Sequence, residues 1–165
     1  MFDLEKVKMV LFDFDDTLCI HSNHEFCESN KIDYMIEMVK GNRNYWDEKG
    51  CLPNIQMKIF VALCNQKNKP LGIISATEMF LSMNFKRMWA EEMYKAKFAN
   101  YCVSTDEGKL EIMEAICRAY NYEPSEILFV DDYHKNVSNA TKLGFQACSP
   151  MEIVNYINKI SSMSK

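Results

Sequence analysis

Asp13 and Asp15 are separated by one residue and follow directly on four apolar residues, 9–12, near the start of the chain. An apolar run with β-prone Val and Phe predicts a buried strand that delivers these acids to the carboxyl edge of a sheet. Since side chains alternate along a strand, we expect both carboxylates on one side and Phe14 on the other. Two carboxylates this close need a cation between them, or one keeps its proton and acts as an acid. The alternative interpretation is an acidic turn without chemistry.

Two later apolar runs, 71–74 and 127–130, also end in polar or small residues. The residues at their ends are Ser75, Ala76, Asp131 and Asp132. Parallel strands place their carboxyl ends at one edge of the sheet, and that edge is where open α/β sheets bind ligands. If these strands are neighbours, the residues at their ends meet the first two aspartates.

A cluster of these carboxylates is untenable without a divalent cation, and oxygen ligands without clustered thiols or imidazoles select Mg²⁺ over zinc. The predicted metal ligands are Asp13, Asp15, Asp131 and Asp132. Mg²⁺ keeps waters and shares its coordination with substrate phosphate, so such a site predicts phosphoryl transfer. In that reaction Asp13 attacks phosphorus to give an aspartyl-phosphate, while Asp15 protonates the leaving oxygen and later activates water.

Ser75, Ala76 and Lys109 are the predicted phosphate-binding residues. Ser75 hydrogen-bonds the phosphoryl group, and Lys109 offsets the charge on that group and on the nucleophile. The alternative role for Ser75 is a cap on the following helix. Lys109 lies in the first turns of a predicted helix, where the helix dipole disfavours a cation. A solvated surface lysine is therefore its alternative, with Lys95 or Lys97 taking its place.

His21 and His24 follow the first predicted strand, where a lid would bring them over the substrate. A surface position is the more common outcome for such histidines, so both roles stay open. Asp16 and Thr17 are predicted to be turn residues that bind the backbone.

The elements that position these residues alternate between strands and helices. Strands are predicted over 9–12, 71–74, 101–103, 127–130 and, weakly, 145–148, and helices over 25–39, 54–66, 77–83, 86–97, 104–120, 136–143 and from 150 onward. This alternation predicts an α/β fold whose parallel sheet is covered on both faces and connected by right-handed crossovers. We expect one domain over residues 1–165, with residues 19–53 forming a small cap or lid inserted after the first strand.

The composition is that of an ordinary globular domain: 165 residues, 48% hydrophobic and 25% charged. A net charge of −4 argues against general nucleic-acid or anionic-membrane binding. No apolar run approaches about 18 residues and the first residues carry no basic-then-apolar signal, so we expect neither a membrane span nor export. Seven cysteines without a CxxC pair or a His/Cys ligand spacing indicate reduced thiols in a reducing cytosol.

The hexapeptide that begins at Asp13, DFDDTL, resembles the first motif of the haloacid dehalogenase (HAD) superfamily of phosphatases. Ser75 is similar to its second motif, Lys109 to its third, and the tripeptide VDD that ends at Asp132 to its fourth. The resemblance covers about residues 8–148. It implies a three-layer, Rossmann-like parallel sheet of the HAD type with a small cap after the first strand.

The second acid of the first motif narrows the implied reaction. Superfamily dehalogenases and P-type ATPases lack an aspartate at the position of Asp15, whereas phosphatases and phosphomutases carry one. The resemblance therefore implies a Mg²⁺-dependent phosphomonoester hydrolase, and Asn136 stands where the family often places a further polar residue over the metal. The alternatives are a phosphomutase or phosphotransferase, and a non-catalytic phosphate-binding or regulatory protein. A response-regulator receiver needs a lone phospho-acceptor Asp and a later Lys where this chain has Ser75 and Phe145.

The substrate class stays open at this stage. A small cap leaves the site accessible, which is compatible with phosphorylated small molecules and with macromolecular phosphates. Small-cap members of the superfamily often use a partner subunit as their lid, so an oligomer is compatible as well.

Overall fold

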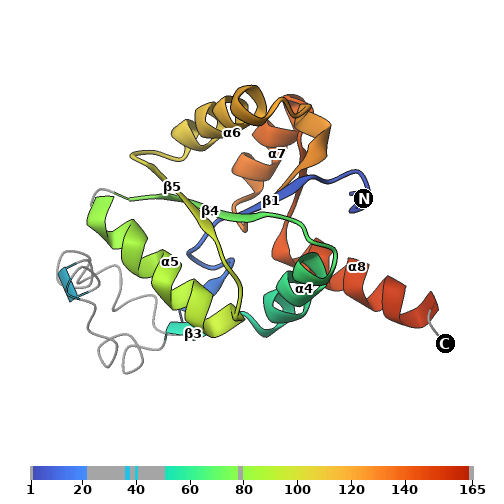
Figure 1. The fold of residues 1–165 in the computed structure, drawn as a ribbon, viewed down its shortest axis with the longest axis horizontal. Helices are drawn as coiled ribbons and strands as arrows, with labels where there is room; N and C mark the ends of the chain where they lie inside the picture. The colour runs from blue at the N-terminus through green and yellow to red at the C-terminus, as the bar shows by residue number, and fades with distance from the viewer. Residues whose placement is uncertain (1, 22–35, 38–39, 41–50, 78–79, 164–165) are drawn as a thin grey trace.

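A five-stranded parallel sheet forms the centre of the molecule (Figure 1), in a computed structural model that describes residues 2–21, 36–37, 40, 51–77 and 80–163. Its strands, in spatial order, are β5 (Ala99–Val103), β4 (Leu71–Ala76), β1 (Met9–Phe12), β6 (Ile127–Val130) and β7 (Gln146–Cys148). All four neighbouring pairs are parallel. The predicted α/β class with a parallel, Rossmann-like sheet is thus confirmed.

Helices cover both faces of this sheet (Figure 1). One face carries α4 (Ile55–Gln66), α5 (Phe80–Tyr94) and α8 (Pro150–Met163), and the other carries α6 (Glu107–Tyr120) and α7 (His134–Lys142). A short 3-10 helix, η1 (Pro124–Glu126), leads into β6. The result is the three-layer arrangement that strands alternating with helices require.

The apolar runs of the central strands fill two separate cores because their side chains alternate. Val10 and Phe12 of β1 pack with residues of α4, α5 and α8. Met9 and Leu11 point to the other face and pack with residues of α6 and α7. Burial on both faces explains why β1, β4 and β6 have almost continuous apolar sequences.

Two local predictions need correction. The helices expected over 77–83 and 86–97 are one helix, α5. The first strand ends at Phe12, so Asp13 and Asp15 follow it in a turn rather than occupying alternate strand positions. Asp16 has a left-handed backbone with φ 54°, and this reversal ends the strand geometry that simple alternation assumed. Phe14 is nevertheless fully buried, as expected.

A small antiparallel ribbon of β2 (Cys19–His21) and β3 (Cys51–Pro53) was not predicted. These strands stand at the two ends of the predicted insertion, 19–53. Most of that insertion, including His24 and most of the predicted helix over 25–39, lies outside the described residues. The cap therefore stays a prediction.

The ribbon is fastened to the main fold by hydrogen bonds at its base. The Tyr94 hydroxyl of α5 donates to the Leu18 carbonyl and accepts from the Asn54 backbone N–H. Asn54 caps α4 by accepting from the Gln56 N–H, and its amide donates to the Thr17 carbonyl. The start of α4, the end of α5 and the turn after β1 are thereby held at one point.

Candidate active site

Lys109 stands at the centre of the residues that the sequence singled out. It lies in the first turn of α6 and is only 3% exposed. Its Nζ donates to Asp13 Oδ1 at 3.0 Å and to Asp131 Oδ2 at 2.9 Å, and it pairs with Asp106 Oδ1 at 2.9 Å. The alternatives Lys95 and Lys97 are exposed. The helix dipole disfavours an ammonium in the first turn of a helix, but the attraction of the three carboxylates outweighs this effect.

The carboxylates reach Lys109 because β1 and β6 are adjacent and in register. Phe12 pairs with Val130, and the Asp13 backbone N–H donates to the Val130 carbonyl at 2.8 Å. Asp13 and Asp131 therefore leave the sheet at the same edge, as the expected convergence of strand ends requires.

Further hydrogen bonds fix the two acids that follow β6. Asp131 is fully buried, and it accepts from the Tyr133 N–H at 2.8 Å and from Asn136 Nδ2 at 3.0 Å. The backbone N–H of Asp132 donates to Thr17 Oγ1 at 3.1 Å, and that hydroxyl lies 3.4 Å from Asp132 Oδ1. Asn136, whose role was open, thus touches Asp131 directly, and Thr17 links the turn after β1 to the turn after β6.

The carboxylates of Asp13, Asp131 and Asp132 form a group that fits a hard divalent cation. One oxygen of each lies within 4.8 Å of the others. The pKa of Asp13 is raised to about 7, mainly by burial of its carboxyl group and also by the negative charge of Asp131. The positive charge of Lys109 opposes this shift. Burial and Asp131 also raise the pKa of Asp132. Oxygen donors that repel one another in this way are typical of Mg²⁺ ligands.

The carboxylate of Asp15, predicted as a fourth metal ligand, lies outside that group and has partners of its own. Its Oδ2 accepts from Lys86 Nζ at 2.5 Å, and its Oδ1 lies 2.9 Å from His21 Nε2. Burial raises the pKa of Asp15, but the Lys86 charge and the bonds from both partners outweigh it and hold this pKa well below its ordinary value. Although burial opposes it, the bond to Asp15 raises the pKa of His21 to about 10.

Lys86 also connects Asp15 to the end of β4, because its Nζ donates to Ser75 Oγ at 2.9 Å. Ser75 is fully buried, and the neighbouring Ala76 ends β4 in register with Val103. Sequence reasoning missed Lys86. The signal was present, since it shares one helix face with Ser82, Met83, Trp89 and Ala90, all of which are buried. A buried lysine on the apolar face of a helix needs an anionic partner.

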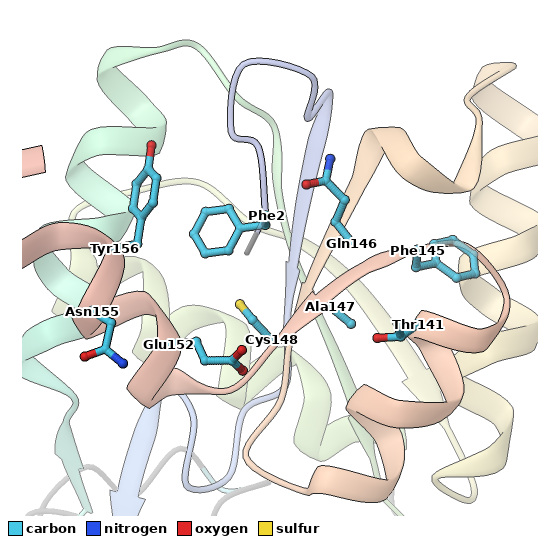
Figure 2. A pocket seen from close by; sticks show the side chains of 9 residues that line it. All are labelled: Phe2, Thr141, Phe145, Gln146, Ala147, Cys148, Glu152, Asn155 and Tyr156. Carbon is cyan, nitrogen blue, oxygen red and sulfur yellow. The ribbon is translucent and has the colours of Figure 1, made fainter. Parts of the chain in front are cut away.

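One cavity lined by described residues lies away from this site. A cavity of about 440 Å³ lies between β7, α8 and the N-terminal segment, where Phe2 and Tyr156 pack at a centroid distance of 4.6 Å (Figure 2). None of the carboxylates around Lys109 lines it. A smaller hollow of about 190 Å³ does adjoin the site, and Asp106 and Asn136 are among its lining residues.

Comparisons with known proteins agree with this geometry at the level of the fold. No protein-family model matches the chain, and no curated protein matches it in sequence. A predicted HAD-like family hydrolase from Porphyromonas gingivalis superposes with a TM-score of 0.53 at 16% identity, over 97% of this chain and 98% of that one. The chain has the HAD fold.

A second HAD structure is similar to a comparable extent. It is a HAD family enzyme from Bacteroides thetaiotaomicron in complex with magnesium, with a TM-score of 0.52 and 19% identity over 88% of this chain and 93% of that chain. The same enzyme with magnesium and inorganic phosphate gives a TM-score of 0.51 at 17% identity. None of the helices in the described part of this HAD-fold chain combines the length and apolar character needed to cross a bilayer.

Proposed function

We propose that this protein is a Mg²⁺-dependent phosphomonoester hydrolase that works through an aspartyl-phosphate on Asp13. The observation that carries the proposal is that Asp13 contacts the Lys109 ammonium and lies beside the metal-compatible carboxylates of Asp131 and Asp132. The HAD fold supports it, as does the binding of magnesium and inorganic phosphate by a structural neighbour.

The ion would be held by Asp13, Asp131 and Asp132, with Asn136 fixing the orientation of Asp131. When bound, Mg²⁺ supplies positive charge against the phosphoryl oxygens and orients them for displacement. The remaining steps belong to residues of the chain.

Asp13 is the nucleophile in this proposal. Its carboxylate oxygen forms a bond to phosphorus while the bond from phosphorus to the ester oxygen breaks. Lys109, 3.0 Å from Asp13 Oδ1, offsets the negative charge that gathers there. A water molecule then attacks phosphorus, which releases inorganic phosphate and restores the Asp13 carboxylate.

Asp15 is the proposed acid and base for the leaving oxygen and for that water, and it relays a proton between them and the Lys86 ammonium to which it is hydrogen-bonded. His21 and Lys86 hold its carboxylate from two sides, so its position is fixed before substrate binds. The bond from Lys86 to Ser75 extends the same support to the proposed phosphate-binding end of β4. Ser75, Ala76 and Lys109 would then surround the phosphoryl group.

The test is hydrolysis of p-nitrophenyl phosphate by the full chain with Mg²⁺ and with EDTA. Asp13→Asn and Asp15→Asn are compared with Asp3→Asn, a change of the same kind at an aspartate whose side chain is 53% exposed. We expect Mg²⁺-dependent turnover in the wild type and in Asp3→Asn. Turnover should fall at least about 10³-fold in Asp13→Asn and in Asp15→Asn, as it does when a catalytic residue is removed from the triad of a serine protease.

Turnover that survives in Asp13→Asn would refute the covalent mechanism. If the wild type has no turnover on this substrate, thermal stability with Mg²⁺ and beryllium fluoride decides. A gain that Asp13→Asn lacks supports an intact nucleophile with a more demanding substrate, whereas no gain refutes the proposed function.

A further inference from the structure

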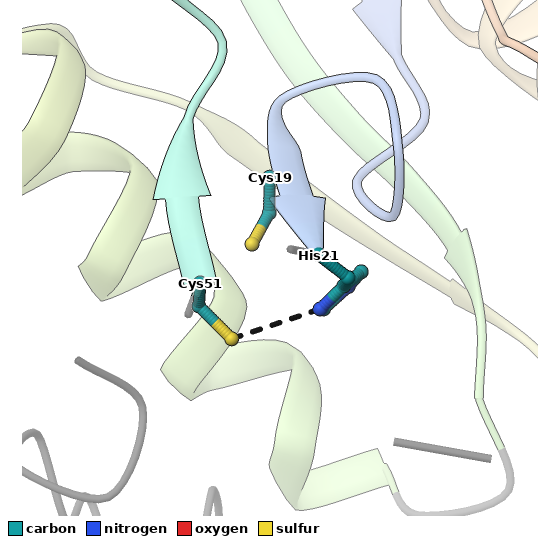
Figure 3. Close-up of side chains that lie close together, drawn as sticks. All are labelled: Cys19, His21 and Cys51. Atoms are coloured by element: carbon teal, nitrogen blue, oxygen red, sulfur yellow. Dashed lines mark hydrogen bonds between the residues drawn. The ribbon is translucent and has the colours of Figure 1, made fainter. Parts of the chain in front are cut away.

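Two thiols and an imidazole, which are metal ligands of a different kind from the carboxylates around Asp13, meet beside Asp15 in the ribbon of β2 and β3. Figure 3 shows the side chains of Cys19, His21 and Cys51 gathered in one place, with His21 Nδ1 lying 3.6 Å from Cys51 Sγ. One ligand atom of each residue lies within 4.8 Å of the other two. Cys19 and Cys51 are not joined by a disulfide.

The ribbon brings these residues together across a long stretch of sequence. In the antiparallel register His21 stands directly opposite Cys51. Cys19 precedes His21 by two positions, so its side chain lies on the same face of the strand. All three residues are buried, with exposures of 0%, 7% and 3% in chain order. Together they make a site shielded from bulk water.

The chemistry of the donors selects a transition metal. Two cysteine sulfurs and one imidazole nitrogen are ligands that zinc and similar borderline or soft ions prefer, and Mg²⁺ does not. A tetrahedral ion with bonds of about 2.3 Å to sulfur and about 2.0–2.1 Å to nitrogen places those atoms about 3.5–3.6 Å apart. The observed His21 to Cys51 distance of 3.6 Å matches. A hydrogen bond between a thiol and an imidazole has a similar length. The third donor, Cys19, is therefore what distinguishes a metal site from a hydrogen-bonded Cys–His pair.

The far side of the imidazole ring is arranged as in metal sites. His21 Nε2 lies 2.9 Å from Asp15 Oδ1, and a metal-bound histidine almost always donates its other ring N–H to a carboxylate or carbonyl. The tautomer that donates to Asp15 directs the Nδ1 lone pair toward the two sulfurs. Metal binding then displaces the protons that these three groups carry.

We propose that Cys19, His21 and Cys51 bind one zinc-class transition-metal ion. The ion clips together two strands of only three residues each, which are too short to be stable as an isolated hairpin. A metal ion that links two distant points of the chain stabilises the fold more when the segment between them is longer. The segment between His21 and Cys51 is long in this sense. The site is separate from the oxygen site at Asp13, and His21 joins the two through Asp15.

Metal analysis of the full chain purified without chelators is the first measurement. We expect about one zinc per chain in the wild type and in Cys64→Ser, a matched control because Cys64 is also a buried cysteine but lies in α4. Cys19→Ser and Cys51→Ser are expected to contain none, with folding of each variant checked by circular dichroism.

Cobalt substitution gives a spectroscopic signature that is independent of activity. Co²⁺ bound to thiolates shows sulfur-to-metal charge-transfer absorption and intense tetrahedral bands, whereas Co²⁺ on carboxylates shows neither. We expect these bands in the wild type and in Asp131→Asn, and a loss of Co²⁺ affinity in Cys51→Ser greater than roughly 10-fold, the least that even outer partners of a metal site cost.

If the serine variants fail to fold, the wild type alone decides the question. Removing zinc with a chelator in the presence of excess Mg²⁺ should lower the melting temperature, and zinc should restore it. The proposal is overturned if the protein carries no zinc and gives no thiolate-to-cobalt bands. It is equally overturned if Cys19 and Cys51 prove to be joined by a disulfide in the purified protein, because the sulfurs then no longer act as ligands.

Discussion

Replacement of Lys109 by methionine tests the electrostatic account of the site most directly. Methionine keeps most of the length and apolar stem of lysine but removes the ammonium that donates to Asp13 and Asp131. The acids are left buried and facing one another, with side chains that are 10% and 0% exposed. The variant should therefore be less stable in EDTA, and the loss should come from unpaired charge rather than from lost packing.

The magnitude follows from the burial of the partners. Removing one member of a buried ion pair costs about 3–5 kcal/mol. Asp13, whose pKa is already raised, can take up a proton in the variant, so the expected loss is at the lower end, about 3 kcal/mol. In a domain of this size that is a fall in Tm of about 6–12 °C, at about 2–4 °C per kcal/mol. Mg²⁺ at about 100 times its Kd for the variant should return about 2.7 kcal/mol of this. The wild type should gain less at the same Mg²⁺ concentration, because its Lys109 already offsets the charge of Asp13 and Asp131.

Urea unfolding followed by circular dichroism, with EDTA and with Mg²⁺, measures both effects. Lys97→Met is the matched control, because Lys97 is 91% exposed and pairs only at the surface with Glu91. It should change the free energy of unfolding by no more than about 0.5 kcal/mol. If Lys109→Met is as stable as the control in EDTA, or if Mg²⁺ stabilises it no more than the wild type, the account of a charge-balanced site is refuted.

Three further changes test other parts of the molecule. Lys86→Met should lower kcat for p-nitrophenyl phosphate about 10²–10³-fold, with partial recovery in Lys86→Arg; an unchanged kcat would leave the lysine a structural role only. Gly72→Ala should cost about 1–3 kcal/mol of unfolding free energy, because its Cβ would lie 2.8 Å from Leu11 Cδ2, and an unchanged urea midpoint would contradict this packing. Tyr94→Phe should cost about 1 kcal/mol through loss of the bond to the Leu18 carbonyl, again measured by the urea midpoint and contradicted if that midpoint is unchanged.

The parallel sheet could be predicted because its strands are short apolar runs that end in polar residues. The run over 127–130 coincides with β6. The helices before and after it, α6 and α7, are amphipathic. The ribbon of β2 and β3 could not be found in the same way. Three-residue strands have too few side chains for a period to show, and the pairing of Cys19–His21 with Cys51–Pro53 spans a gap that local patterns do not cross.

The site residues, like the strands, divide into those that local sequence patterns could place and those that depend on contacts between distant segments. Residues that directly continue a strand, such as Asp13 and Asp131, could be placed together from topology alone. Lys86 was missed, because the break predicted between residues 83 and 86 hid the continuous buried face of α5 from which it reaches Asp15. The absence of a CxxC pair argued against a His/Cys ligand set, although Cys19 and His21 are only two positions apart. Cys19, His21 and Cys51 meet only through the register of the ribbon.

The turn between the two sites explains why Asp15 lies beside both. The Leu18 and Cys19 N–H groups both donate to the Phe14 carbonyl, and the Asp16 N–H donates to the Cys19 carbonyl. Asp16 takes the left-handed conformation that this tight reversal needs, at a cost that only a well-determined surrounding structure sustains. Because the reversal leads the chain directly from the nucleophile loop into β2, any force that holds the ribbon in register also holds Asp15. A metal in the ribbon would therefore act on the orientation of the proposed acid without touching the substrate.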